Sequence, residues 1–102
     1  MINLKDAIAI LLKKINNNEA AFRANPPVIL HDYIKEYSWG WLIPYDSKDF
    51  IENGNAINAY MGNVPIFVDK FDGTAFFCSD IVEDPEITIN NYGLSKYPNL
   101  LS

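Results

Sequence analysis

The side chains that could do chemistry in this sequence are few, and their spacing matches no common catalytic pattern. His31 is the only histidine and Cys78 the only cysteine. They could act together only if the fold brought them into contact, and no G-x-S-x-G motif supplies a serine nucleophile. We expect His31 to be a partly exposed strand residue and Cys78 to be a small buried strand thiol. The sequence therefore predicts no catalytic residue.

Metal ligands are equally sparse. One cysteine and one histidine cannot form a zinc site without carboxylates, and the chain contains neither C-x-x-C nor H-x-x-E. The segment 69–73 starts like a calcium loop but lacks the further oxygen ligands and the closing Glu. A hairpin turn explains this segment better, so we expect no metal ion and no cofactor.

The acidic side chains are the remaining polar feature. The net charge is −5, and it is uneven: residues 1–25 carry four bases and two acids, whereas residues 26–102 carry four bases and eleven acids. An acidic body repels phosphate backbones, which argues against direct nucleic-acid binding and favours a basic protein partner. A solvated surface that keeps the protein soluble is the alternative. The candidate partner-binding residues are the acids of two clusters: Asp46, Asp49, Glu52, Asp80, Glu83, Asp84 and Glu86.

The segment Gly62–Cys78 has the clearest predicted structure. Two short runs of β-branched and aromatic residues flank a turn at Gly73, which predicts a β-hairpin. Ile66 and Val68 should point to one face of the sheet and Phe67 to the other. We therefore expect this part of the sheet to be covered on both faces.

The first segment predicts an amphipathic helix over Leu4–Ile15, with Asn3 as its N-cap. Its apolar residues follow steps of three and four: Leu4, Ala7, Ile8, Leu11, Leu12 and Ile15. After a short strand over residues 28–30, period-two alternation predicts one strand with an aromatic face. That face would carry Tyr37, Trp39, Trp41, Ile43 and Tyr45. Gly40 would leave the opposite face open to close packing.

Two further elements are predicted from capping residues. The stretch from Asp46 to Asp49 is typical of a cap followed by a short helical turn. Asp84 and Pro85 suit the N-cap and first position of a tail helix. The run Ile87–Ile89 fits a strand as well as a helix.

These elements predict a single α+β domain over residues 1–102. It would contain an antiparallel sheet of three to five strands, with the helix over Leu4–Ile15 packed on one face. There is no basic start followed by an apolar block, and no apolar run reaches the roughly 20 residues of a membrane span. A single cysteine excludes an internal disulfide and fits a reducing cytoplasm. We expect a cytoplasmic protein that does not associate with membranes.

A longer pattern runs from Trp39-Gly40-Trp41 through Tyr45 and Ser47 to Phe50 and Gly54, and then through the block from Gly62 to Lys70 (GNVPIFVDK) into Asp72-Gly73. This pattern resembles the immunity protein 35 family of bacterial polymorphic toxin systems. The resemblance covers about residues 3–92. It implies a small cytoplasmic α+β protein that binds and neutralises a toxin made by the same bacterium, with no catalysis and no cofactor. The matching residues are better explained as fold determinants than as a toxin-binding site.

Three functions follow as hypotheses. The first is an immunity protein that blocks a cognate toxin sterically, with acidic side chains facing a basic cleft such as that of a nucleic-acid-targeting toxin. The second is a chaperone-like or structural binding module that exposes the aromatic strand face. The third is a small enzyme that uses His31. A domain of this size has only a few kcal/mol of net stability, so a homodimer is also compatible with the sequence.

Overall fold

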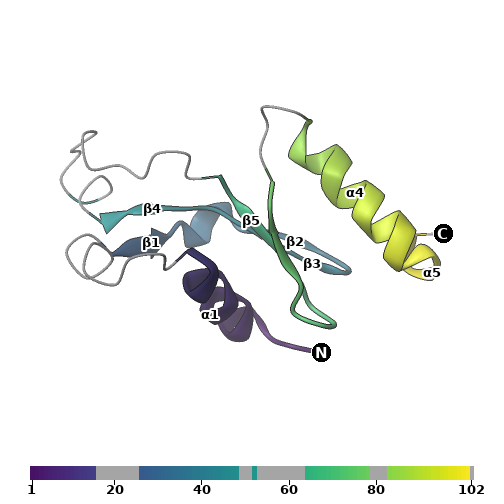
Figure 1. The fold of residues 1–102 in the computed structure, drawn as a ribbon, viewed down its shortest axis with the longest axis horizontal. Coiled ribbons are helices and arrows are strands. Elements are labelled where there is room, and N and C mark those ends of the chain that lie inside the picture. Colours follow the sequence, from purple (N-terminus) through teal and green to yellow (C-terminus); the bar gives the residue numbers. More distant parts are fainter. Residues whose placement is uncertain (16–25, 49–51, 53–63, 79–82, 102) are drawn as a thin grey trace.

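The computed structural model describes the chain except residues 16–25, 49–51, 53–63, 79–82 and 102. The described part is an α+β fold, as predicted, with helices on both sides of antiparallel strands (Figure 1). The helices are α1 (Leu4–Ile15), the 3₁₀ helix η1 (His31–Tyr33), α4 (Pro85–Lys96) and α5 (Pro98–Leu101). The strands are β1 (Pro27–Ile29), β2 (Lys35–Tyr37), β3 (Gly40–Ile43), β4 (Tyr45–Ser47), β5 (Ile66–Asp69) and β6 (Ala75–Phe77).

Helix α1 begins and packs as its sequence predicts. The N–H of Asp6 donates to the Asn3 side-chain oxygen at 2.8 Å, which satisfies a free donor of the first turn. Ala7 and Leu11 are fully buried in a cluster that includes Val68 of β5. The helix lies close against β3, β5 and β6, so its apolar stripe covers one face of the sheet.

The strands form two sheets. Four strands lie in the order β2-β3-β5-β6, and β1 pairs with β4; every pairing is antiparallel. The chain passes from the larger sheet to the smaller one at Pro44. Ile43 pairs with Ile66 in the larger sheet, and Tyr45 pairs with Ile29 in the smaller one. Proline has no N–H to donate, and its C=O accepts from Leu30 at 3.0 Å.

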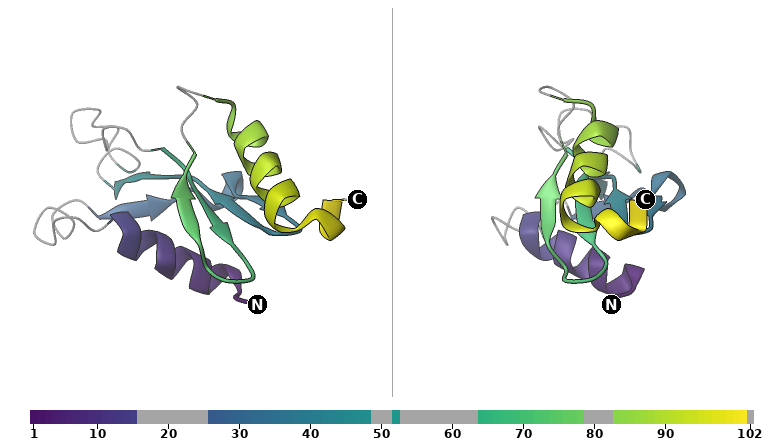
Figure 2. Two further views of the ribbon diagram at one scale, coloured as in Figure 1. Left: turned by 45° about the vertical axis from the view of Figure 1, so that its right-hand side comes forward. Right: turned by 90° about the vertical axis from the view of Figure 1, so that its right-hand side faces the viewer.

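The predicted hairpin is present as β5 and β6. Gly73, in the connecting loop, has φ +77°, a conformation that glycine adopts at little steric cost. Val68 and Ile66 belong to the cluster beneath α1, whereas Phe67 belongs to a second cluster with Ile89 of α4. Helices therefore cover both faces, α1 on one side and α4 on the other, as Figure 2 shows.

The single aromatic strand predicted over residues 37–45 is wrong. Residues 38 and 39 form a tight turn between Tyr37 and Gly40, which pair with each other. The reversal ends the alternation of side chains along β2 at Tyr37, and a new alternation begins with β3 at Gly40. Trp39 thus packs in the cluster beneath α4, while Trp41 and Tyr45 pack in the cluster beneath α1.

Gly40 allows close packing at the start of β3, as predicted. A Cβ atom built at this position would lie 2.4 Å from Cζ of Phe67 and 2.4 Å from the carbonyl oxygen of Val68. Both distances are far below van der Waals contact. The bare glycine backbone therefore makes room for the Phe67 ring in the cluster beneath α4.

Two expectations based on capping residues had different outcomes. The cap and short helical turn predicted from residue 46 onward are confirmed only in part: Asp46 and Ser47 lie in β4, Lys48 and Glu52 are helical, and residues 49–51 lie outside the described residues. At the tail helix the prediction is confirmed: Asp84 is the N-cap, its side chain accepts from the N–H of Glu86 at 2.9 Å, and Pro85 follows it. The ambiguous run Ile87–Ile89 is helical.

Candidate functional site: the outer face of helix α4

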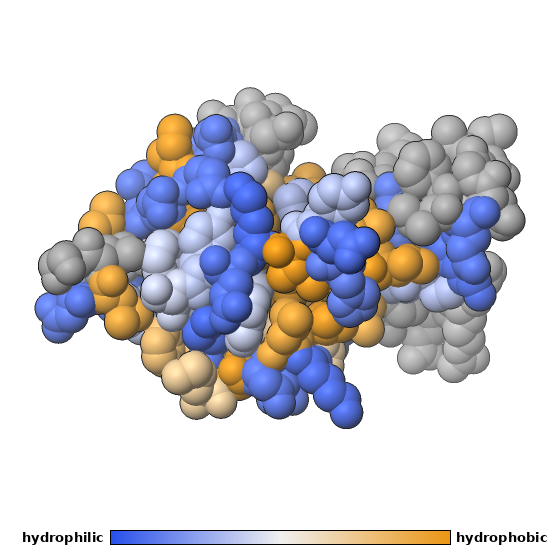
Figure 3. Space-filling model, turned by 180° about the vertical axis from the view of Figure 1, so that it is seen from behind, coloured by the Kyte–Doolittle hydropathy of each residue, from blue (hydrophilic) through white to orange (hydrophobic). Residues whose placement is uncertain are grey.

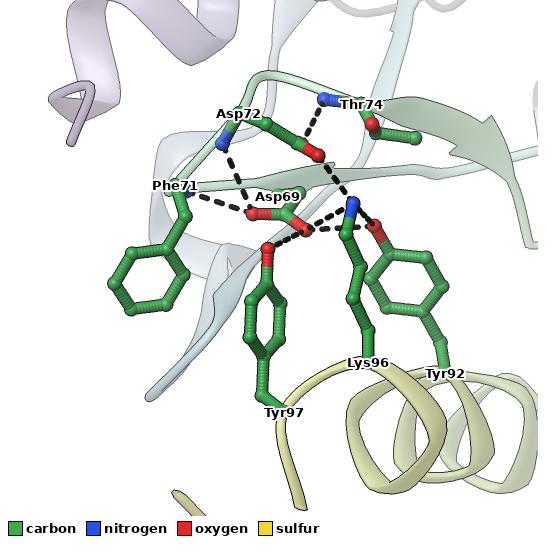
Figure 4. A network of polar contacts seen from close by, with 7 residues as sticks. All are labelled: Asp69, Phe71, Asp72, Thr74, Tyr92, Lys96 and Tyr97. Atoms are coloured by element: carbon green, nitrogen blue, oxygen red, sulfur yellow. Dashed lines mark hydrogen bonds and ion pairs between the residues drawn. The ribbon is translucent and has the colours of Figure 1, made fainter.

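The inner side of α4 is held by a carboxylate that is fully buried. Asp69, the last residue of β5, is 0% exposed. One of its oxygens accepts from the hydroxyls of Tyr92 and Tyr97, each at 2.7 Å, and the other accepts from the N–H of Phe71 at 2.7 Å (Figure 4). The ammonium of Lys96 lies 3.3 Å from the same carboxylate. One sheet residue thus binds three side chains from the end of α4 and the residue that follows it.

The hydrogen bonds set the protonation states of the side chains in this network. Burial alone would raise the pKa of Asp69, but donors from Tyr97, Tyr92 and the loop backbone outweigh it, so the pKa is lowered. Burial and the hydrogen bond to Asp69 raise the pKa of Tyr97 to about 12. The hydrogen bond from Lys96 lowers the pKa of Asp72, a neighbouring loop carboxylate, to about 2. At neutral pH the network therefore consists of two carboxylates, one ammonium and two neutral phenols.

A second carboxylate holds the start of α4. Glu86 accepts hydrogen bonds from the ammonium of Lys35 at 2.8 Å and from the Tyr37 hydroxyl, both on β2. The hydrogen bond from Lys35 is the main reason that the pKa of Glu86 is lowered. Helix α4 is therefore tied to the sheet at both ends, to β2 at its start and to β5 at its end.

Aromatic side chains fill the space between α4 and the sheet. Phe67 lies at the centre, with its ring centroid 5.3 Å from that of Phe76 and 5.8 Å from that of Tyr92. Ile89 is fully buried in the same cluster, and Cys78 is 2% exposed. Burial raises the pKa of the Cys78 thiol to about 11, so it stays protonated and a poor nucleophile at neutral pH.

The outer face of α4 has an unusual composition for a helix in contact with water. Ile87 and Leu94, seven residues apart and so on one face, are 50% and 55% exposed. Asn90 and Asn91 lie between them and are also exposed. Along the helix, no charged residue lies between Glu86 and Lys96. Figure 3 shows hydrophobic side chains spaced along the side that carries α4, separated by hydrophilic ones.

The acidic cluster predicted at residues 80–86 lies at the start of this face, except for Asp80, which is outside the described residues. Glu83 and Asp84 are exposed, and Glu86 is partly exposed. Glu83 accepts from the Thr88 hydroxyl at 2.9 Å. Three carboxylates therefore border the apolar positions of α4.

The two described members of the other acidic cluster, Asp46 and Glu52, differ in exposure. Asp46 is 7% exposed, and its side chain accepts from the N–H of Ser47 at 2.7 Å. Glu52 is exposed and lies 3.7 Å from the ammonium of Lys48. Asp49 lies outside the described residues. Of the candidate acids that the structure describes, only those at the start of α4 lie together.

The imidazole of His31, the residue considered for catalysis, has no hydrogen-bonding partner among the described residues. His31 is exposed on η1. A hollow of about 300 Å³ beside it is lined by residues 28–33.

No group of three or more His, Cys, Asp or Glu among the described residues could hold a metal ion. No helix in the same residues is long and apolar enough to span a membrane.

Comparison with known proteins adds no assignment. No family model matches the sequence, and no significant match is found among curated proteins or solved structures. The resemblance to the immunity protein 35 family therefore stays a prediction.

Ile87 and Leu94 are the site residues that sequence reasoning missed, because their common face appears only once residues 85–96 are known to be helical.

Proposed function

We propose that this chain is an immunity protein that binds a cognate bacterial toxin and neutralises it by steric occlusion, using the outer face of α4. One observation carries the proposal: a helix fixed at both ends presents an uncharged outer face with two half-exposed apolar side chains, Ile87 and Leu94. Solvent-facing helix surfaces normally carry charged residues. Depletion of charge around apolar anchors is typical of the centre of a protein interface.

The acidic residues at the start of α4 make one end of this face negatively charged. Glu83, Asp84 and Glu86 would face basic residues of the toxin and accelerate its approach, because an acidic rim steers a basic partner. The network at Asp69 supports the same role indirectly. It holds α4 in place before binding, so little conformational entropy is lost in the complex.

The alternative of an exposed aromatic platform has lost its support. Trp39, Trp41 and Tyr45 are 4%, 7% and 4% exposed. These rings form the two hydrophobic cores and are not available to bind an unfolded chain. No comparable observation favours an enzyme that uses His31.

The test is a binding measurement with the protein encoded by the neighbouring reading frame as the probe. Ile87→Lys and Leu94→Lys should each weaken binding at least tenfold, because each places a charge in the centre of the interface. Ser95→Lys is the matched control, since it adds the same charge at an exposed position of the same helix outside the Ile87–Leu94 line. Equal affinities for all three variants and the wild type would contradict this use of α4.

A further inference from the structure

The outer edge of β6 carries backbone groups that pair with no residue the structure describes. Strand β6 is an edge of the four-stranded sheet. The N–H of Cys78 donates to the C=O of Pro65 at 2.9 Å, so Cys78 and, by alternation, Phe76 direct their backbone groups toward β5. Ala75 and Phe77 therefore direct their N–H and C=O groups away from β5, and no described residue pairs with them.

In its own sequence and among the described strands, this edge lacks the usual protection against pairing. Natural edge strands carry charges or prolines, or are covered by another element. Residues 74–78 contain no charged residue and no proline. Figures 1 and 2 show α1 and α4 on opposite faces of the sheet, and no described strand pairs with the outer edge of β6. The ring of Phe77 is 49% exposed, with the ammonium of Lys14 5.4 Å from its centroid.

We propose that two copies of this chain pair through the outer edges of β6, antiparallel and with Phe76 on the two-fold axis. In this register Ala75 of each copy faces Phe77 of the other. Both members of such a pair direct their backbone groups outward, so each of the two pairs exchanges two hydrogen bonds. The dimer joins the two four-stranded sheets into one.

Side chains fit the same register. On the α1 face, the exposed Phe77 ring of one copy lies over the small side chain of Ala75 of the other, and such cross-strand contacts stabilise antiparallel pairs. The facing pairs Ala75–Phe77, Phe76–Phe76 and Thr74–Cys78 contain no charged residue. No like charges oppose each other across the two strands, although the chain as a whole is acidic. The edge is therefore self-complementary.

The small size of the edge sets the strength of the dimer. Stable interfaces bury at least roughly 1,200 Å² in total, more than a pair of three-residue strands and their rings provide. The dimer is therefore weak and forms reversibly as the concentration rises. The pairing does not use Ile87 or Leu94, so it is independent of the proposed toxin-binding face.

Sedimentation and hydrogen exchange of the full chain test this proposal. The average mass should rise toward that of two chains with increasing concentration, and the amides of Ala75 and Phe77 should exchange more slowly as it does. Phe77→Glu should abolish both effects while leaving the thermal midpoint of the monomer within a few degrees of the wild type. A chain that stays monomeric at every concentration, or dimerises equally well with Phe77→Glu, would overturn the proposal.

Cross-linking tests the register in a Cys78→Ala background. Phe76→Cys places two thiols opposite each other at the two-fold axis, with Cα atoms roughly 4.5 Å apart, and mild oxidation should link the copies. Thr74→Cys is the control, on the same face one residue before β6. In this register the two copies of residue 74 lie four residues apart along the strands, roughly 13 Å at about 3.3 Å per residue, so they should not link.

Linking of Thr74→Cys at a rate equal to or above that of Phe76→Cys would overturn the register, since it would show random collision. Phe76 also packs against Tyr92, so its replacement carries a risk to folding. Should the Phe76→Cys chain fail to fold, sedimentation of the wild type and of Phe77→Glu decides the question.

Discussion

Replacing Asp69 by Asn removes the charge at the centre of the network beneath α4 while keeping the shape of the side chain. The carboxylate accepts from two tyrosine hydroxyls and a backbone N–H, and it pairs with Lys96. The amide of Asn has only one acceptor oxygen, and its NH₂ group points donors at groups that also donate. No cavity forms, so any loss of stability comes from the polar contacts.

The expected loss is about 3 kcal/mol in the free energy of unfolding. Breaking a buried charged pair costs about 3–5 kcal/mol, and hydrogen bonds to charged groups contribute about 1.5–3 kcal/mol each. We take the lower end because Lys96 keeps a second partner, Asp72, at the surface. Since 1 kcal/mol shifts the midpoint of a domain of this size by about 4–8 °C, the thermal midpoint should fall by about 15 °C.

Urea unfolding with linear extrapolation measures the change directly. Asp72→Asn is the matched control: it makes the same chemical change beside the same lysine, but Asp72 has a side chain 45% exposed. An exposed pair contributes less than about 1 kcal/mol. Neutral surface substitutions usually change the free energy of unfolding by no more than about 0.5 kcal/mol. If Asp69→Asn changes it by less than this, or by no more than Asp72→Asn does, the network does not hold α4 and the reasoning is refuted.

Four further outcomes are expected. Stability should fall as the pH drops from about 4 toward 2, because folding lowers the pKa of Asp72 from 3.8 to about 2 and also lowers that of Asp69; urea midpoints across this range measure it. Stability should also fall as the pH rises from 10 toward 12, because folding raises the pKa of Tyr97 from 10.0 to about 12, and flat urea midpoints there would contradict this. Gly40→Ala should cost about 3 kcal/mol or more in urea unfolding, since its methyl group would clash with a ring and a backbone oxygen; a neutral result would show that the sheet adjusts. Cys78 should react with a thiol reagent only in urea, and rapid labelling of the folded chain would contradict its burial.

Local patterns in the sequence predict the elements whose signals are local. The apolar steps of Leu4–Ile15 and its Asn3 cap predict α1, and alternation around Gly73 predicts both faces of the β5–β6 hairpin. The pattern at Gly40 predicts close packing as well. In each case the spacing of apolar residues, or a backbone position that only glycine fits, is enough to predict the local structure.

Features that depend on tertiary contacts could not be predicted. Ser38 and Gly40 are compatible with a turn, but the alternation of aromatic residues over 37–45 continues across them, and this alternation predicts one straight strand with both tryptophans on one face. Asp69 could be recognised only as a turn residue, because its tyrosine partners at the end of α4 and just after it lie more than twenty residues away. The charged clusters indicated one end of the candidate face, but its apolar centre at Ile87 and Leu94 needed the helix itself.

Growth rescue tests the central claim most directly. Cells that express the toxin encoded beside this chain are supplied with the wild type, with Ile87→Lys combined with Leu94→Lys, or with Ser95→Lys. The account predicts that the wild type and Ser95→Lys restore growth and that the double variant, folded to the same extent by circular dichroism, does not. Failure of the wild type to restore growth would contradict the proposed function, and full rescue by the double variant would contradict the role of α4.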